Sequence, residues 1–435
     1  MKHIFTKVTA FILIAIFISA CNAVKRVPNG KFLLTKNEIF ENNKVISDET
    51  TFSQLYQKPN SKIAGIPLFL TFNNWAKPNI DSTFQAIQNP VATSPTDKPL
   101  AQKGKSFWQH GISNFLKKIG EPPVIYDPLK TDKSVMRLSY FYFNKGFFDV
   151  KIKSVFDTIG LKKGRVNYYI EPGVAYTIDS VSTEIATVVL DSLYQSTQSN
   201  SIIKPGNRYK TEDFENEKNR ITTLFRNSGA YDFQPNNVSF DIDTIQKKNK
   251  ASVRLKIGDY NYQKQDVTVT EPFKLYKISD VRIFTDYSAA DAKATLTDST
   301  EYKNFKLVSR NKLKYKPFAI TDAVFINKGG YFSDTKTNLT SRYLSNLKIF
   351  NYPSIIYEQD KRDSTAQSLI AKIYLTPKKK YSFGQSLDVT HSNIQNIGIS
   401  FSPSISIRNV FNGAETLEFS GRANVGSSKD FANPN

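Results

Sequence analysis

The clearest pattern of apolar and polar positions lies near the carboxyl end, where the two kinds alternate. Between Ile397 and Ile407 apolar residues and one proline occupy the odd positions, and glycine or serine occupies every even position. The alternation resumes from Leu417 to Val425, after a turn predicted at Asn412-Gly413. Alternation of this length predicts β-strands that carry one apolar face and one small, polar face.

An earlier strand is predicted from Tyr381 to His391. Its apolar face consists of Tyr381, Phe383, Leu387 and Val389. Strands of about ten residues with this pattern are typical of a transmembrane β-barrel, with lipid outside and water inside. Amphipathic strands of a soluble sheet have the same pattern, so both interpretations stay open. Pro403 lacks a ladder donor and indicates an edge or a bulge.

The predicted strands are too few to close a barrel. An open edge in lipid would leave backbone groups without hydrogen-bond partners. Either the strands belong to a soluble sheet, or the sequence is a fragment that lacks most of the barrel. We expect a fragment.

A second pattern repeats upstream: a stretch with helical spacing is followed by a pair of strands. The predicted helices are Thr131–Asn144, Thr211–Asn227 and Ser333–Lys348. The predicted strand pairs are Phe147–Ser154 with Arg165–Glu171, Asn237–Thr244 with Ala251–Ile257, and Ser354–Gln359 with Ser368–Leu375. Short motifs also recur, because Tyr176–Val181 is echoed by Tyr276–Val281, and Ile203–Tyr209 by Ile326–Phe332. A repeat of strand, helices, strand and strand therefore occurs at least twice in the sequence.

Less regular elements precede these repeats. A hairpin is predicted over Lys31–Val45 with its turn at Asn42-Asn43, and a short helix over Phe52–Tyr56. The polar stretch Asn89–Lys105 predicts a linker or loop, and Phe107–Ile119 has helical spacing.

The amino end has the order of a secretory signal: a short basic segment, an apolar run from Val8, and small residues. Ile18-Ser19-Ala20 leads into Cys21, the single cysteine of the chain. This placement resembles the lipobox of bacterial lipoproteins, which implies cleavage between Ala20 and Cys21 and acylation of the Cys21 thiol. The alternative is an ordinary signal peptide with a chance cysteine.

The composition excludes some functions and favours others. If Cys21 carries lipid, the exported protein has no thiol for disulfides, catalysis or metal binding. The net charge of +20 favours an anionic membrane surface over nucleic acid for an exported chain. Lys378, Lys379 and Lys380 precede the first predicted barrel strand, and we weigh contact with phospholipid headgroups equally with a solvated linker. No metal-binding or catalytic motif is visible, so we expect neither enzyme activity nor a cofactor or metal.

Four stretches resemble segments of one protein family. Asn144–Asp149, Gly229–Phe233 and Leu347–Tyr352 resemble the turn that follows the second helix of a POTRA domain, and Arg408–Leu417 resembles an early barrel hairpin. Together they resemble the BamA/TamA superfamily of outer-membrane assembly proteins, in which POTRA domains precede a surface-antigen-type β-barrel. The lipobox, together with Gln57–Ile63, is similar to the TamL-like lipoprotein branch of Bacteroidetes-type bacteria.

The resemblance implies an α+β fold of tandem POTRA-like β-α-α-β-β domains followed by the first antiparallel strands of a transmembrane β-barrel. The expected divisions are a signal peptide (1–20), a lipidated amino terminus (21–24), POTRA-like domains (25–173, 174–262, 273–378) and the start of the barrel (380–435).

It also implies a function. The chain would be an outer-membrane lipoprotein, with its POTRA-like domains in the periplasm, that assembles, inserts or translocates outer-membrane and surface proteins. Unfolded clients would pair with sheet edges, for which Phe147–Lys153 and Ser368–Leu375 are candidates. Further partners would be the lipid bilayer and a TamB-like inner-membrane bridging protein, but not nucleic acid. A soluble surface lipoprotein acting as a binding or adhesion module and, well behind it, a secreted hydrolase remain as alternatives.

Overall fold

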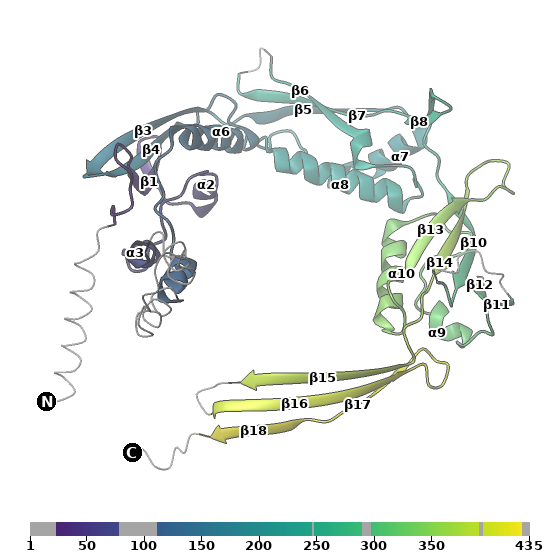
Figure 1. Cartoon of the computed structure of the whole chain (residues 1–435). Helices are drawn as coiled ribbons and strands as arrows, with labels where there is room; N and C mark the ends of the chain where they lie inside the picture. The colour runs from purple at the N-terminus through teal and green to yellow at the C-terminus, as the bar shows by residue number, and fades with distance from the viewer. Residues whose placement is uncertain (1–22, 78–110, 246–247, 289–296, 391–394, 429–435) are drawn as a thin grey trace. The chain divides into compact units, whose positions relative to one another are not determined.

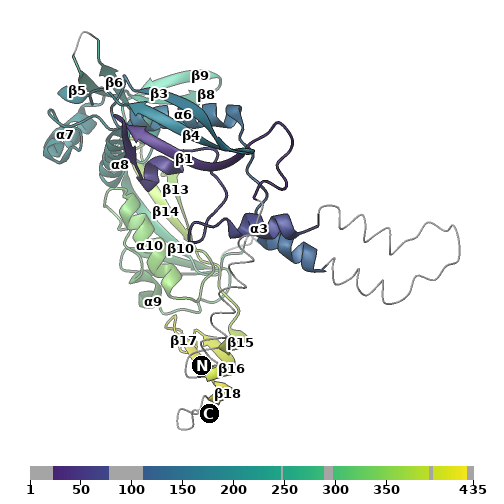
Figure 2. The ribbon, with the colours of Figure 1, turned by 90° about the vertical axis from the view of Figure 1, so that its left-hand side faces the viewer.

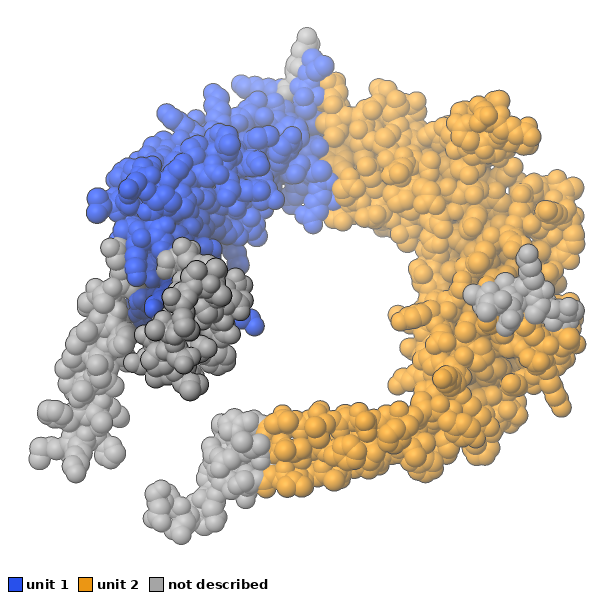
Figure 3. Space-filling view, in the orientation of Figure 1, with its two compact units in different colours: residues 1–179, 205–212, 244–251 blue, residues 180–204, 213–243, 252–435 orange. Residues whose placement is uncertain are grey.

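The computed structural model describes residues 23–77, 111–245, 248–288, 297–390 and 395–428, and these divide into two compact units (Figure 3). Unit 1 comprises residues 1–179, 205–212 and 244–251, and unit 2 comprises 180–204, 213–243 and 252–435. The predicted cleavage and lipidation residues, Ala20 and Cys21, and the predicted linker lie outside the described residues.

Unit 1 is built on a sheet with the strand order β2-β1-β4-β3 (Figure 1). β1 (Leu33–Glu41) runs parallel to β4 (Lys163–Glu171), whereas β2 (Lys44–Ile46) and β3 (Lys151–Gly160) are antiparallel to their neighbours. Asn42 and Asn43 both have positive φ, so the predicted hairpin and its turn are confirmed.

Helix α6 (Pro128–Asn144) packs on this sheet. Its first turn is prepared by Asp127, whose carboxylate accepts the Leu129 N–H at 3.0 Å, and by Pro128, which needs no donor there. Leu138 and Tyr142 share a buried cluster with Val166, Tyr168 and Ile170 of β4.

Shorter helices complete unit 1: α2 (Glu49–Ser53), α3 (Leu68–Trp75) and residues 111–119. The helix predicted over Phe52–Tyr56 lies earlier, because the Asp48 carboxylate accepts the Thr51 N–H at 2.9 Å and starts the helix there.

Unit 2 contains a sheet with the order β5-β7-β6, formed by β5 (Thr177–Ile185), β7 (Lys250–Ile257) and β6 (Val238–Asp243). The first residues of β5 and β7 are assigned to unit 1. Helices α7 (Val188–Ser196) and α8 (Thr211–Asn227) contribute Leu190, Tyr194, Ile221 and Phe225 to its core. The hairpin of β8 (Tyr260–Lys264) and β9 (Val267–Glu271) was not predicted, because its turn residues Gln265 and Asp266 adopt positive φ without glycine or asparagine.

The next sheet has the order β11-β12-β10-β14-β13. Its central strand β10 (Lys277–Phe284) runs parallel to β12 (Phe305–Ser309) and to β14 (Ser368–Tyr374). β11 (Asp298–Tyr302) and β13 (Ser354–Gln359) form its two edges, so the prediction that Ser368–Leu375 is an edge is wrong.

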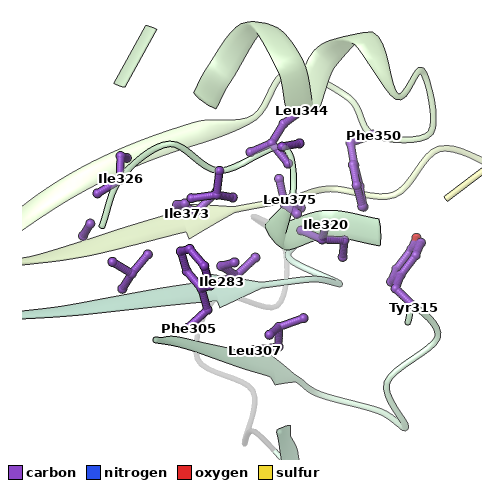
Figure 4. Packing of buried hydrophobic residues seen from close by; sticks show 14 of the residues in the cluster. Ile283, Phe305, Leu307, Tyr315, Ile320, Ile326, Leu344, Phe350, Ile373 and Leu375 are labelled. Atoms are coloured by element: carbon purple, nitrogen blue, oxygen red, sulfur yellow. The ribbon is translucent and has the colours of Figure 1, made fainter. Parts of the chain in front are cut away.

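Helices α9 (Pro317–Thr321) and α10 (Asp334–Asn346) cover this sheet, and α10 lies beside β13 and β14 in both ribbon views (Figure 2). Figure 4 shows the core between them, which includes Leu344 of α10, Ile320 of α9, Ile283 of β10 and Ile373 of β14.

A fourth sheet follows, which we call the C-terminal sheet: β15 (Tyr381–Thr390), β16 (Gln395–Arg408), β17 (Thr416–Ser420) and β18 (Ala423–Ser428), all antiparallel. β16 pairs with β15 on one side; on the other, its residues from Ser404 to Arg408 pair with β17 and its earlier residues pair with β18. Pro403 falls where the partner changes, so its missing N–H interrupts no regular ladder there.

Three of the sheets share one arrangement: the last strand of each sequence repeat lies between its first strand and its middle strand. The orders β1-β4-β3, β5-β7-β6 and β10-β14-β13 follow this rule. The predicted α+β class, with repeated units followed by antiparallel strands, is confirmed. Among the described residues, no helix combines the length and the apolar character needed to cross a membrane.

Candidate functional site

The C-terminal sheet places its apolar side chains together on one face. Tyr381 lies opposite Ile407, Phe383 opposite Ile405, Leu387 opposite Phe401 and Val389 opposite Ile399. On the other side of β16, Ile405 lies opposite Phe419 and Ile399 opposite Val425. Since side chains alternate between faces along a strand, all of these residues share one face, which we call the apolar face.

This apolar face is exposed. The four side chains singled out from the sequence, Tyr381, Phe383, Leu387 and Val389, have relative exposures of 63%, 67%, 68% and 71%. The opposite face consists of small or polar residues, including Ser382, Gly384, Ser386, Ser402 and Ser404. Contiguous exposed apolar faces mark surfaces that meet a partner or a membrane.

The segment 409–415 between β16 and β17, which we call the docking loop, packs against the α+β domain before it. Ala414 is 4% exposed and belongs to the same core as Ile283 and Leu375. The Asn409 side chain donates to the Lys314 carbonyl at 2.8 Å, and the Lys316 N–H donates to the Asn412 carbonyl at 2.7 Å. The C-terminal sheet is therefore held to that domain by specific contacts as well as by the chain connection.

The docking loop is shaped by its own side chains. Asn409, Asn412 and Ala414 have φ angles of 55°, 60° and 63°. The Asn409 carbonyl oxygen Oδ1 accepts the Ala414 N–H at 3.1 Å, and the Glu415 carboxylate accepts the Phe411 N–H. Burial tends to raise the pKa of Glu415, but the hydrogen bonds from backbone N–H groups outweigh it, and the pKa is lowered. The docking loop belongs to Arg408–Leu417, the stretch that resembles an early barrel hairpin.

A cavity of about 270 Å³ lies between the docking loop, the end of β14 and the segment after β12. Lys314, Lys378, Lys380 and Arg408 line it, together with Asp286 and Tyr315. Burial raises the pKa of Tyr315 to about 12, with a contribution from the charge of Asp286. We call this space the basic cavity.

The structure places the predicted Lys378, Lys379 and Lys380 at this cavity in different ways. Lys378 and Lys380 line it, whereas Lys379 accepts a 2.8 Å hydrogen bond from Arg408 Nη1 through its carbonyl. Sequence reasoning missed Lys314. The sequence feature that could have identified it is the alternation of basic residues from Arg310 to Lys316, because alternate residues of an extended segment point the same way.

The sheet edges are the other surfaces named from the sequence. β3 is an edge strand of its sheet, but it begins at Lys151, so only the last residues of the predicted segment Phe147–Lys153 belong to it. The chain turns before this point at Gly146, whose φ is +85°. β13 takes the edge position that was expected for β14.

His3, His110 and His391 lie outside the described residues. Within the described ranges, no group of three or more His, Cys, Asp or Glu side chains is placed to hold a metal ion.

Comparison with protein-family models and with curated proteins gives no match. Among solved structures, the chain is similar to POTRA domains 3–5 of BamA from Haemophilus influenzae, with 11% identity, 81% of this chain and 99% of that chain covered, and a TM-score of 0.35. It is also similar to BamA from Haemophilus ducreyi lacking POTRA domains 1–3 (10% identity, 57% and 37% covered, TM-score 0.36). A third similar structure is CdiB from Acinetobacter baumannii (10% identity, 58% and 38% covered, TM-score 0.27). The chain thus spans little more than a third of the length of the last two.

Proposed function

We propose that this chain is a BamA/TamA-type outer-membrane protein that assembles, inserts or translocates outer-membrane and surface proteins. The observation that carries the proposal is the exposed apolar face of the C-terminal sheet, joined directly to repeated α+β domains. Residues 25–173, 174–262 and 273–378 serve as periplasmic POTRA-like domains, and residues 380–435 begin the membrane-embedded part.

In this proposal β15 is the first strand of a transmembrane barrel. Tyr381, Phe383, Leu387 and Val389 face lipid, and the serine- and glycine-rich face lines a wet interior. The contrast between the two faces supports this orientation. Transfer of the apolar side chains into lipid lowers the free energy, whereas serine hydroxyls need hydrogen-bond partners.

Clients bind through their backbones at sheet edges. An edge strand presents unpaired N–H and C=O groups, and a client strand that pairs with them needs little sequence specificity. The proposed client-binding edges are β13 in unit 2 and β3 in unit 1. Unfolded outer-membrane proteins are the proposed clients.

The amino end carries the lipid anchor in this proposal. Acylated Cys21 tethers the first POTRA-like domain near the bilayer, in the manner of a TamL-like lipoprotein, and a TamB-like protein bridges to the inner membrane. Replacing Cys21 with alanine should leave the full-length protein in the membrane but misplace this domain. Release of that variant into the soluble fraction would contradict the membrane role of the strands.

The membrane role is tested by two neighbouring substitutions on opposite faces of β15. Leu387→Arg puts a charge on the apolar face, at about 2–4 kcal/mol if that position lies near the bilayer midplane, whereas Ser386→Arg puts it on the polar face. Each variant is mixed with phospholipid vesicles and floated on a density gradient. We expect Leu387→Arg to lose flotation and Ser386→Arg to keep it. Equal flotation of both variants would favour a soluble binding module.

The assembly role is tested in the bacterium that encodes the chain. Depletion of the protein should lower the amounts of outer-membrane and surface proteins while periplasmic proteins stay constant, measured by quantitative mass spectrometry of both fractions. An unchanged outer-membrane proteome would reject the assembly role.

A further inference from the structure

We propose that the basic cavity binds the phosphate of an anionic lipid headgroup. The lipid as the source of this phosphate rests on the function proposed above, whereas the recognition of a phosphate group rests on the cavity itself.

Positive side chains converge on the cavity from three separate parts of the chain. Lys314 comes from the segment after β12, Lys378 and Lys380 from the connection after β14, and Arg408 from the end of β16. Among the residues that the structure describes, none of these lysines forms an ion pair with a carboxylate. Their charges are therefore not neutralised by the protein and can attract an anion.

Asp286, the acidic residue of the cavity lining, is already engaged. Its carboxylate accepts the backbone N–H of Arg310 at 3.0 Å and that of Asn311 at 3.2 Å. These bonds hold Asp286 at the end of β12 and leave the basic side chains in excess around the cavity.

Arg408 has a donor without an acceptor. Its Nη1 donates to the Lys379 carbonyl at 2.8 Å and its Nη2 to the Ser382 hydroxyl at 3.0 Å. Its Nε is buried and has no hydrogen-bond partner in the described structure. Buried donors are normally paired, and a phosphate oxygen is a strong acceptor for a guanidinium.

The cavity has room for such a group. A water molecule occupies about 30 Å³ in the liquid, so about 270 Å³ admits a phosphate together with several waters.

The position of the cavity relative to the apolar face indicates a lipid. Lys380 precedes Tyr381 and Arg408 follows Ile407, and Tyr381 and Ile407 are the opposed pair at that end of the apolar face. The Arg408 N–H donates to the Lys380 carbonyl at 2.8 Å, which keeps the two residues beside each other. A lipid whose acyl chains lie along the apolar face would have its headgroup at this end.

The test compares the wild-type chain with two triple variants in maltoside micelles. Lys314→Gln/Lys378→Gln/Lys380→Gln removes the three lysine charges of the cavity and keeps Arg408, and the exposure of the three side chains makes the variant compatible with folding. Lys328→Gln/Lys336→Gln/Lys361→Gln removes the same charge from other exposed positions of unit 2. Binding of phosphatidylglycerol, with phosphatidylcholine as the net-neutral comparison, is titrated by native mass spectrometry.

We expect the cavity variant to bind phosphatidylglycerol at least about tenfold more weakly than the wild type, and the control variant to stay within about twofold. Wild-type affinity in the cavity variant, or an equal loss in the control, would overturn the proposal. Inorganic phosphate is then added as a competitor. Displacement of the lipid at equal concentration would overturn the lipid source and assign the cavity to free phosphate.

This result is independent of vesicle flotation. Loss of phosphatidylglycerol binding in the cavity variant, combined with equal flotation of Leu387→Arg and Ser386→Arg, would retain the cavity and reject the membrane-embedded strands. The reverse combination would reject the cavity alone.

Discussion

The guanidinium of Arg226 at the end of α8 is bonded to the carboxylate of Asp334 at the start of α10, with Nη2 donating to Oδ1 at 2.9 Å. Arg226 also donates to the carbonyls of Tyr231 and Phe233 at 2.6 and 2.8 Å. Its guanidinium lies 5.3 Å from the ring centre of Phe332. One side chain thus joins the two successive α+β domains of unit 2.

Matching hydrogen bonds occur at this joint in unit 2 and at a second joint in unit 1. The Tyr276 N–H donates to the Gly229 carbonyl at 2.9 Å, and the Tyr176 N–H donates to the Gly146 carbonyl at 2.8 Å. At the last residue of each helix an asparagine side-chain oxygen accepts a hydrogen bond from the following domain: Asn227 from the Ser333 hydroxyl, and Asn144 from the Thr211 hydroxyl. The recurring sequence motifs therefore correspond to a repeated joint between domains.

Replacing Arg226 with alanine should lower the free energy of unfolding by about 2–3 kcal/mol, because two carbonyls and a carboxylate lose a charged donor. Asp334→Asn should cost less, since the carbonyl bonds remain. Urea denaturation of the full chain measures both. Arg254→Ala, which removes an exposed ion pair with Glu184 at 3.8 Å, serves as the control and should change stability by less than about 0.5 kcal/mol. Equal effects of Arg226→Ala and Arg254→Ala would contradict the role of the joint.

Two glycines with similar φ angles allow the stability cost of a steric clash to be distinguished from the cost of a strained backbone. Gly146 and Gly206 have φ of +85° and +89°. A Cβ on Gly146 would lie 2.5 Å from the Tyr209 carbonyl oxygen, whereas one on Gly206 would meet nothing within 4 Å. We expect Gly206→Ala to cost about 1–2 kcal/mol. Gly146→Ala should cost about 1–3 kcal/mol more through the added clash. Thermal unfolding compares the two, and a larger loss for Gly206→Ala would refute the contact.

Acid sensitivity of unit 2 should depend on Glu217, which is 1% exposed and accepts hydrogen bonds from Arg220 at 2.7 and 2.9 Å and from the Ile202 N–H at 2.9 Å. Burial tends to raise the pKa of Glu217, but these bonds outweigh it and lower the pKa. Because the folded-state pKa is depressed, the contribution of Glu217 is complete above its unfolded value of about 4.3 and is lost as the pH falls through the lower folded value.

The change that tests this is Glu217→Gln. The variant should be less stable than the wild type near pH 7, and the difference should shrink below about pH 4. Urea midpoints between pH 3 and pH 7 measure it. Glu215→Gln is the control, since the Glu215 side chain is 62% exposed. A difference that is constant with pH would show that Glu217 does not titrate as proposed.

Asn409→Ala should loosen the docking loop, because it removes the bond to the Lys314 carbonyl and the acceptor of the Ala414 N–H. Loss of about 1–2 kcal/mol corresponds to roughly tenfold faster hydrogen exchange at the Ala414 and Lys316 amides. Hydrogen–deuterium exchange with peptide resolution measures this. Asn424→Ala, on exposed β18, should leave those amides unchanged; equal protection in Asn409→Ala and wild type would contradict the docking contacts.

Strands and helices could be predicted from the sequence because their periods depend on neighbouring residues. The predicted helix Thr211–Asn227 and strand Ser354–Gln359 have the same bounds in the structure. The apolar face of β15 follows from period-two alternation alone, and its register with β16 preserves that face across the sheet.

The position of each strand within its sheet could not be predicted in this way. β14 is a short, mostly apolar run whose period does not place it at an edge or in the interior, and its pairing with β10 decides between them. β3 starts later than predicted because Gly146 turns the chain and the Phe148 ring packs against Tyr176 and Tyr209. Both outcomes rest on contacts between residues distant in sequence.

The repeated units and the two-faced strands can be read along the chain alone, because side-chain polarity and local geometry set the period of each element. Long-range contacts decide which strands are edges, bring Ala414 into a core, and place Lys314 and Arg408 with Lys378 and Lys380 at one cavity. These depend on parallel pairing and loop docking, whose partners lie far along the chain and leave no local pattern.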